Sequence, residues 1–389
     1  MHYAFNTWID TMKPSASVIQ MEKAKAMIAQ GADIVNLAGG EPNFDTPAPV
    51  TYRAIRELVN GNTHYVTGAG LPILRERIAQ YLKDKDGISC GMDQILVTPG
   101  GKFAIYLAAC VLLNPGDEVL IPEPSWVSYS SIVHAIGAVP VPVPLRFEDN
   151  YSMTRQVLEE KITEKTKLMI INSPNNPTGR MLTQDEAEML MQLAQDRNLM
   201  IISDEIYSEL VYDRNRHISL ASLPHGMDHV VTVDGFSKFA AMTGWRLGFL
   251  CAHMEIMKRI LKLYQHTMTC VSGFSQQAAL QAFECREDFA AMLKAYTARR
   301  SAFIGALQRI DGVDARFPEG AFYAWVRIHK NNFDALTLCD YLLNEAGVAG
   351  VPGTAFGGGG ERCVRFSFAS SMEELEKAAE RISRAVKKL

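Results

Sequence analysis

The sequence predicts an α/β fold, with a mostly parallel sheet sandwiched by helices and a smaller α+β domain formed by both ends of the chain. Length and composition fit this class, because 389 residues with 48% hydrophobic and 21% charged side chains can bury a large core. From about residue 90 to about residue 280, short aliphatic runs alternate with helical patterns. Aliphatic runs without polar alternation, each followed by a helix, are typical of strands covered on both faces.

The alternating region supplies the predicted strands and helices in order. The strands are expected at residues 95–98, 118–121, 167–172, 199–203, 230–235 and 246–252. Helical patterns follow the first three of them, at residues 102–113, 126–136 and 184–198. We therefore assign residues 46–284 to one large domain, in which the strand ends would hold the ligand.

The pattern changes near residue 285. Long helical stretches at residues 286–310 and 373–389 bracket isolated strands at residues 321–328 and 363–369. This predicts a small α+β domain over residues 285–389. Residues 1–45 are too few to bury a core alone, so we expect them to pack on the small domain or on a second subunit. The GGGG stretch at residues 357–360 is interpreted as a flexible loop.

Charge and cysteine usage exclude several classes of protein. A net charge of −4 without a long basic run argues against nucleic acid as a partner, so small-molecule substrates are expected. The seven cysteines are scattered, with no CxxC pair, which predicts reduced thiols and no metal site. No leader sequence or membrane-spanning run is found, so a cytoplasmic location without membrane attachment is expected.

Several polar features stand where predicted strands end. Gly100 and Gly101 lie between a strand and a helix, which suits either an anion site or a tight turn. Asp204 ends an apolar strand and needs a cationic partner, either a ligand or a structural salt bridge. Residues 171–180 (INSPNNPTGR) form a rigid turn, because Pro174 and Pro177 forbid a helix. Its asparagines could serve the turn or a ligand.

A Gly/Ser loop and the strand after it carry a further group of polar residues. Ser237 and Arg246 form a natural phosphate clamp. Lys238 is either a solvated surface lysine or a nucleophile in a dry site. Together, the strand-end features call for a ligand with a phosphate, a cationic ring nitrogen and an aldehyde. Pyridoxal 5'-phosphate has all three.

Several motifs in this order closely resemble the class I/II, fold-type I aminotransferase family. They are KPSASV (13–18), GEPNFDTP (40–47), SPNNPTG (173–179), SDEIY (203–207), SKFAAMTGWRLG (237–248), PGTAFG (352–357) and RFSFA (365–369). The resemblance covers nearly the whole chain. It implies a fold-type I transferase whose large domain binds pyridoxal 5'-phosphate.

The resemblance also implies roles for individual residues around the cofactor. Lys238 matches the lysine that binds the cofactor covalently and moves protons, and Asp204 matches the partner of the pyridine nitrogen. Other matching positions are Asn176 and Tyr207 for the phenolic oxygen, Ser237, Arg246 and the amides of Gly101 and Lys102 for the phosphate, and Trp126 for stacking on the ring. A core tryptophan is the other interpretation of Trp126.

The family pattern extends to the substrates and to a second subunit. Arg365 matches the residue that binds the substrate α-carboxylate, helped by Asn176, Trp126 and the backbone of Gly40. Tyr65 matches a tyrosine that reaches the cofactor phosphate of the neighbouring subunit, which implies a homodimer with shared sites.

The expected activity is ping-pong transamination between an L-amino acid and a 2-oxo acid. One aspartate-using branch of the family has a lysine at the position of Lys102, which favours aspartate as donor and 2-oxoglutarate as acceptor. Tyr129 and Phe356 would equally suit an aromatic or aliphatic donor. A carbon–sulfur lyase and a cofactor-sensing regulator share the fold, but the regulator needs a DNA-binding module in front, and none fits before Lys13.

Overall fold

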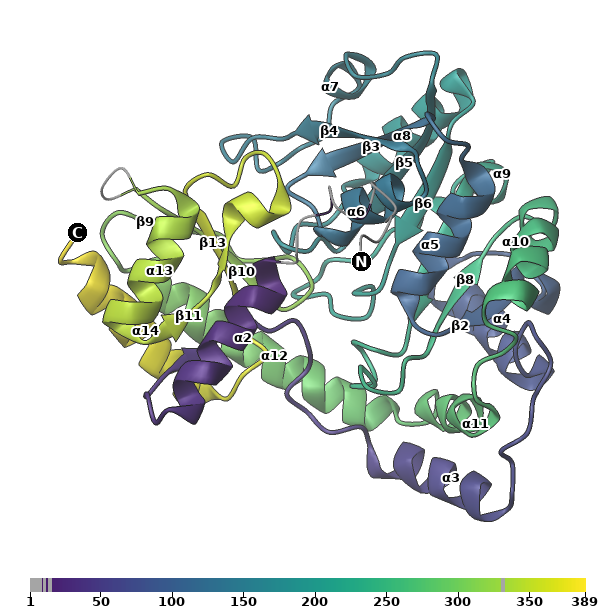
Figure 1. The fold of residues 1–389 in the computed structure, drawn as a ribbon, viewed down its shortest axis with the longest axis horizontal. Helices are drawn as coiled ribbons and strands as arrows, with labels where there is room; N and C mark the ends of the chain where they lie inside the picture. The colour runs from purple at the N-terminus through teal and green to yellow at the C-terminus, as the bar shows by residue number, and fades with distance from the viewer. Residues whose placement is uncertain (1–8, 10–11, 13–15, 330–332) are drawn as a thin grey trace, which may run out of the picture.

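A computed structural model describes residues 9, 12, 16–329 and 333–389 of the chain (Figure 1). Residues 13–15 of the KPSASV motif lie outside the described residues. Within the described part, a seven-stranded sheet has the order β2-β8-β7-β6-β5-β3-β4. Its strands are β2 (Ile95–Thr98), β3 (Glu118–Glu123), β4 (Val139–Pro144), β5 (Thr166–Asn172), β6 (Met200–Asp204), β7 (Val230–Gly235) and β8 (Gly248–Cys251).

The sheet is parallel except at one strand. β8 runs antiparallel to both of its neighbours, β2 and β7, whereas the pairs from β7 to β4 are all parallel. The predicted α/β class with a mostly parallel sheet is therefore confirmed. In the parallel part the carboxyl ends of β5, β6 and β7 meet at one edge, where open α/β sheets bind ligands.

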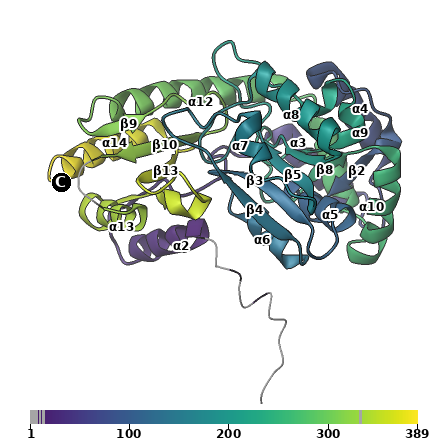
Figure 2. The same cartoon turned by 90° about the horizontal axis from the view of Figure 1, so that it is seen from above.

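Helices cover both faces of this sheet (Figure 2). On β5, Leu168 and Ile170 pack in one core and Met169 and Ile171 in another, so the central four residues of the strand are apolar on both faces. The first core includes α5 (Gly101–Leu112), α6 (Ser128–Ala135) and α10 (Met254–Thr267). The second includes α3 (Ala48–Val59), α4 (Pro72–Asp86), α8 (Gln184–Arg197) and α11 (Gly273–Ala282). Short helices α7 (Arg155–Glu159) and α9 (Gly226–His229) lie beside α8.

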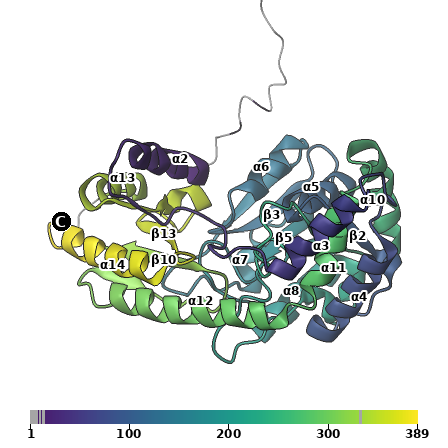
Figure 3. The same cartoon turned by 90° about the horizontal axis from the view of Figure 1, so that it is seen from below.

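A second, antiparallel sheet has the strand order β12-β13-β10-β9. These strands are β9 (Val313–Ala315), β10 (Tyr323–Ile328), β12 (Val351–Pro352) and β13 (Cys363–Ser367). Three helices belong to this part of the chain: α12 (Arg286–Leu307), α13 (Ala335–Ala346) and α14 (Met372–Val386). Figure 3 shows α12 extending from the side of α11 to this second sheet. A separate core of phenylalanine, tyrosine and aliphatic side chains lies between α12, α14 and the strands.

The N-terminal segment contacts this second part of the molecule. Helix α2 (Ala16–Ala29) lies against β11 (Val348–Ala349) and β12, and β1 (Val35–Asn36) pairs with β11 in parallel. Lys23 also forms an ion pair with Asp340 on α13, at 2.6 Å. The division of the chain at residues 46 and 285 stays a prediction.

None of the helices in the described ranges is both long enough and apolar enough to cross a membrane.

Candidate active site

A cavity of about 400 Å³ lies between the carboxyl ends of the parallel strands and the second sheet. Eleven of the twelve residues expected at the site line it: Gly40, Gly101, Lys102, Trp126, Asn176, Asp204, Tyr207, Ser237, Lys238, Arg246 and Arg365. They come from segments far apart in the sequence, which the order of strands brings to one place. The exception is Tyr65, which lies outside this cavity with an exposed fraction of 85%.

Lys238 lies in the loop between β7 and β8, and its ammonium group lies inside the pocket. Its Nζ donates a hydrogen bond of 2.6 Å to the carbonyl oxygen of Gly40. Burial lowers the pKa of Lys238 to about 8, and Glu41 opposes this shift. A lysine with such a pKa has a substantial neutral fraction near physiological pH, so it can act as a nucleophile or a general base.

Asp204 ends β6, and its buried carboxylate faces the same cavity. Oδ2 accepts a hydrogen bond of 2.6 Å from the hydroxyl of Tyr129, and Oδ1 accepts one of 3.3 Å from the amide of Ile206. Burial raises the pKa of Asp204 to about 6, while both of these donors lower it. Within the described ranges no cationic side chain lies within 4.0 Å of this carboxylate, so the structural salt bridge considered from the sequence is not formed there.

The turn after β5 brings one of its asparagines into the pocket. Asn176 lines the cavity, whereas Asn175 stays in the turn and accepts hydrogen bonds from the amide and hydroxyl of Thr178. Asn172 at the end of β5 was missed from the sequence. Its side chain donates to the carbonyl of Asp204 at 2.9 Å and accepts from the amide of Asn176 at 2.8 Å. In the sequence, the available signal was its position as the last residue of the strand predicted at residues 167–172.

A corner of the pocket is built for an anion. Gly100 has φ +87°, and a Cβ there would lie 2.6 Å from the guanidinium of Arg246, so the close approach needs glycine. Helix α5 begins at Gly101, so its first amides and its positive dipole end lie at the cavity that Ser237 and Arg246 also line. Such a set of donors fits a phosphate dianion.

Arg365 on β13 places a buried guanidinium in the wall of the cavity. It donates to Asn176 Oδ1 at 3.0 Å and to the carbonyl of Ala38 at 2.8 Å. Its Nε is buried and makes no hydrogen bond within the described part of the chain. Burial lowers the pKa of Arg365. A buried cation with an unused donor is costly, and a carboxylate from a ligand would compensate for that cost.

Aromatic rings surround these charged groups. The Trp126 ring meets the Tyr129 ring edge-on, with 5.4 Å between the ring centroids. Lys102 Nζ lies 4.8 Å from the centroid of the Trp126 ring. Burial, and then Arg246, lower the pKa of Lys102. The hydroxyls of Tyr207 and Tyr323 are 2.7 Å apart. The cavity can therefore hold a flat aromatic ligand with charged groups at both ends.

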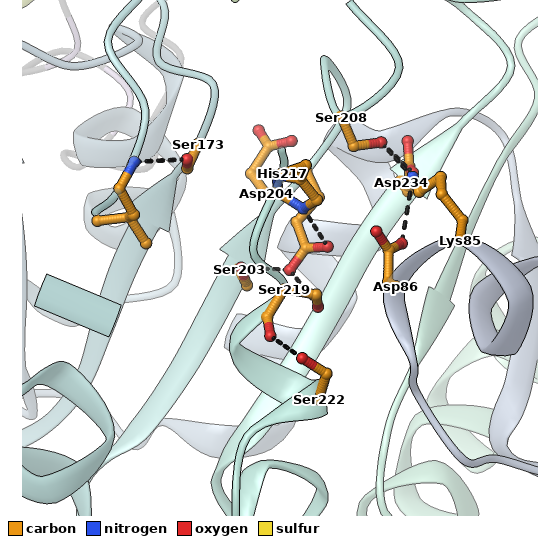
Figure 4. Close-up of polar contacts among 12 residues, drawn as sticks. Lys85, Asp86, Ser173, Ser203, Asp204, Ser208, His217, Ser219, Ser222 and Asp234 are labelled. Carbon is orange, nitrogen blue, oxygen red and sulfur yellow. Dashed lines mark hydrogen bonds and ion pairs between the residues drawn. The ribbon is translucent and has the colours of Figure 1, made fainter. Parts of the chain in front are cut away.

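A second polar network is buried behind the strand ends (Figure 4). Lys85 lies 3.2 Å from Asp86 and 3.5 Å from Asp234, and Ser208 donates to Asp234 at 3.0 Å. Glu205, next to Asp204, accepts from three side chains: Ser203 at 2.7 Å, Ser219 at 2.8 Å and His217 at 3.0 Å. This network holds the ends of β6 and β7 together behind the pocket.

In the residues that the structure describes, no group of three or more His, Cys, Asp or Glu side chains is placed to hold a metal ion.

Comparison with known proteins gives consistent matches along the chain. A family model described as aminotransferase class I and II matches residues 32–382. An aspartate aminotransferase of Musicola paradisiaca is 41% identical over 369 residues, which cover 94% of this chain and 92% of that protein. A bifunctional aspartate aminotransferase and glutamate/aspartate-prephenate aminotransferase of Petunia hybrida is 38% identical over 97% of this chain and 82% of its own length.

Solved structures agree with these matches. The aspartate aminotransferase of Thermus thermophilus with maleate superposes with a TM-score of 0.93 at 37% identity, covering 99% of this chain and 100% of that one. An aromatic aminotransferase of Pyrococcus horikoshii superposes with a TM-score of 0.89 at 39% identity, covering 94% and 99%.

Proposed function

Because this chain belongs to the class I and II aminotransferase family, we propose that it uses pyridoxal 5'-phosphate to transfer the amino group of L-aspartate to 2-oxoglutarate. The chain is an aminotransferase; its cofactor and its substrates are the proposal. One observation carries it. A lysine of lowered pKa shares a cavity with a buried carboxylate that has no cationic partner in the described residues and with a buried guanidinium that has an unused donor.

The residues of the pocket fit the cofactor. Asp204 would pair with the protonated ring nitrogen, and Lys238 would bind the aldehyde. The remaining contacts would come from Asn176 and Tyr207 to the phenolic oxygen, from Ser237, Arg246 and the amides of Gly101 and Lys102 to the phosphate, and from Trp126 to the ring. When bound, the cofactor supplies an electron sink for the carbanion that forms when the substrate loses its Cα proton.

The chain's own residues would bind the substrate and move its proton. Arg365 would hold the α-carboxylate through its guanidinium group, which fixes the direction of the Cα–H bond. Lys238 Nζ has a pKa suited to accepting that proton and returning it. The second half of the cycle would use the same groups for the 2-oxo acid.

Aspartate is proposed as the donor because Lys102 lines the cavity and relatives named aspartate aminotransferase match nearly the whole chain. Lys102 would pair with the distal carboxylate. An aromatic donor is the second candidate. The aromatic aminotransferase of P. horikoshii has a similar fold, and Tyr129 lies beside Trp126.

We further propose a homodimer with shared active sites. Tyr65 is largely exposed, and so are apolar side chains on the flanking helices: Tyr52 at 69% and Val59 at 81% on α3, and Ile73 at 58% on α4. A run of exposed large apolar residues is typical of an interaction surface. In the dimer Tyr65 would contact the cofactor phosphate of the partner subunit. We also propose a cytoplasmic location, which the seven free cysteines support.

The absorption spectrum of the purified protein, recorded before and after addition of single L-amino acids, tests the proposal. We expect a visible band that L-aspartate converts to the pyridoxamine spectrum. Absence of the band after incubation with pyridoxal 5'-phosphate would contradict the cofactor. Conversion by aromatic donors alone would keep the cofactor and overturn aspartate. Release of pyruvate and ammonia without an oxo-acid acceptor would identify a carbon–sulfur lyase instead.

A further inference from the structure

The glycine stretch at residues 357–360 is closely packed, and it surrounds the carboxylate of Glu123. The amide of Gly358 donates a hydrogen bond of 2.6 Å to Glu123 Oε2, and the amide of Ser125 donates one of 2.8 Å to the carbonyl of Phe356. Two hydrogen bonds therefore join the end of β3 to the loop that follows the short helix η3 (Gly353–Phe356). The sequence predicted a flexible loop, and the structure shows that its backbone is closely packed.

Neighbouring atoms explain why this loop is made of glycine. A Cβ on Gly357 would lie 2.1 Å from Glu123 Cδ, and the residue has φ +97°. A Cβ on Gly359 would lie 2.6 Å from the carbonyl oxygen of Leu145, and one on Gly360 would lie 2.3 Å from that of Gly353. Real Cβ atoms do not approach other atoms so closely. The glycines allow the backbone to close around Glu123.

The residue before this loop is Phe356, which is 1% exposed and packs against Arg365, a residue that lines the pocket. The Arg365 guanidinium lies 5.0 Å from the centroid of the Phe356 ring, and Trp325 meets the same ring edge-on at 5.6 Å. Glu123 is three residues before Trp126, which lines the same pocket. The contact thus joins the segment that carries Trp126 to the residue that packs on Arg365.

We propose that Glu123 is a positioning residue for substrate binding: its carboxylate holds the loop at Gly357 and Gly358, and the loop holds Phe356 against Arg365. This proposal rests on the proposed role of Arg365 in binding the substrate carboxylate. Glu123 itself does not line the pocket. Its effect is therefore on how the guanidinium is oriented and shielded from water, and a cation in a drier site attracts a carboxylate more strongly.

Binding of succinate to the holoenzyme, measured by calorimetry, tests this inference, because succinate has two carboxylates and no amino group to react. We expect Glu123→Ala to weaken succinate binding about tenfold, the equivalent of one charge-assisted hydrogen bond. Glu123→Gln should stay within about threefold of the wild type, because its amide oxygen still accepts from Gly358. The dissociation constant of the cofactor should change less than twofold in both variants.

Two further measurements separate this role from a general loss of structure. Gly357→Ala places a methyl group where Glu123 stands, so it should weaken succinate binding as Glu123→Ala does. In a Phe356→Ala background, Glu123→Ala should add little further loss, because the effect passes through Phe356. Additive losses, or unchanged succinate binding by Glu123→Ala, would overturn the inference.

Hydrogen exchange of the backbone amides at residues 356–360 gives a readout that does not depend on substrate binding. Exchange should accelerate in Glu123→Ala and stay close to the wild-type rate in Glu123→Gln. Unchanged exchange in Glu123→Ala would overturn the inference. A wild-type protein that binds no succinate would instead contradict the proposed carboxylate site, whatever the loop does.

Discussion

Tyr129 donates a hydrogen bond of 2.6 Å to Asp204 Oδ2, and both side chains are buried. Burial raises the pKa of Asp204 to about 6. The hydrogen bond from the Tyr129 hydroxyl opposes this shift, because it stabilises the ionised carboxylate. It also occupies one carboxylate oxygen and so fixes the direction of the other. Tyr129, considered from the sequence only as a neighbour of the substrate side chain, thus acts on the group proposed to hold the cofactor ring nitrogen.

Tyr129→Phe should shift the pH dependence of cofactor binding upward. A hydrogen bond to a charged group is worth roughly 1.5–3 kcal/mol, so its loss should raise the pKa of Asp204 by about one to two units. The ionised carboxylate is the form that pairs with the protonated ring nitrogen. Cofactor affinity should therefore weaken below about pH 6 in the wild type, and at a pH about one to two units higher in the variant. Dissociation constants measured from acid to alkaline pH give both midpoints.

Tyr341→Phe is the matched control for this variant. Its hydroxyl also makes one hydrogen bond, of 3.0 Å to the carbonyl of Ala385, but it lies outside the pocket. Tyr341→Phe should therefore have the same pH midpoint of cofactor binding as the wild type. Equal midpoints for the wild type and Tyr129→Phe would show that the hydroxyl does not tune Asp204.

The sequence predicted the residues whose role depends on local position. Asp204 is the last residue of β6, Lys238 lies three residues after the end of β7, and the family motifs contain both. The hydrogen-bond partners Tyr129 and Glu123 could not be predicted in the same way. Tyr129 is 75 positions from Asp204, and Glu123 is 235 positions from Gly358, so only the packed structure brings them together.

Two other features also depend on the packed structure. The antiparallel direction of β8 could not be predicted, because a fully apolar strand looks the same in either direction. The glycine loop was taken as flexible because four glycines have no local preference, whereas its conformation is set by the side chain of Glu123 and by backbone atoms of other segments. Tyr65 stays a prediction, since its proposed contact is with another subunit.

Arg365→Ala should lower kcat/KM for every amino acid. Loss of one member of a buried charge pair costs roughly 2–5 kcal/mol, which corresponds to a decrease of about 30-fold or more. Arg365→Lys keeps the charge but loses the planar fork, so it should recover only part of the loss. Steady-state kinetics with several donors would measure both. A kcat/KM for Arg365→Ala within a factor of a few of the wild type would contradict the carboxylate assignment.

Lys102→Gln should separate acidic from aromatic donors. Lys102 is exposed, and an ion pair in such a position is worth about 1 kcal/mol. We expect kcat/KM for aspartate to fall about fivefold and that for phenylalanine to stay unchanged. An equal decrease for both donors would mean that only the backbone amide of Lys102 matters, as part of the phosphate site.

The Lys238→Ala variant should bind the cofactor without forming a covalent bond to it. The wild-type protein, treated with borohydride, should retain the cofactor mass on the peptide that contains Lys238, whereas the variant should release all of it on denaturation. Turnover should be lost, because no other lysine of lowered pKa except Lys102 lines the described cavity. Cofactor mass found on a Lys102 peptide of the wild type would reassign the nucleophile.

Lys85→Met should destabilise the fold more at pH 8 than at pH 6. Burial raises the pKa of Asp234 to about 7, although Lys85 opposes that shift. The folded state therefore binds a proton more tightly than the unfolded chain, whose aspartates titrate near pH 3.9, so unfolding free energy falls as the pH rises between these two values. Without Lys85 the pKa of Asp234 rises further, and the decline extends to higher pH. At pH 8 the unpaired buried carboxylate should cost roughly 3–5 kcal/mol.

Urea unfolding at fixed protein and cofactor concentration measures this cost. Lys85→Met combined with Asp234→Asn leaves only Asp86 of the two buried carboxylates beside Lys85, so its loss at pH 8 should be smaller than that of Lys85→Met alone; equal losses for Lys85→Met at both pH values would contradict the role given to Lys85.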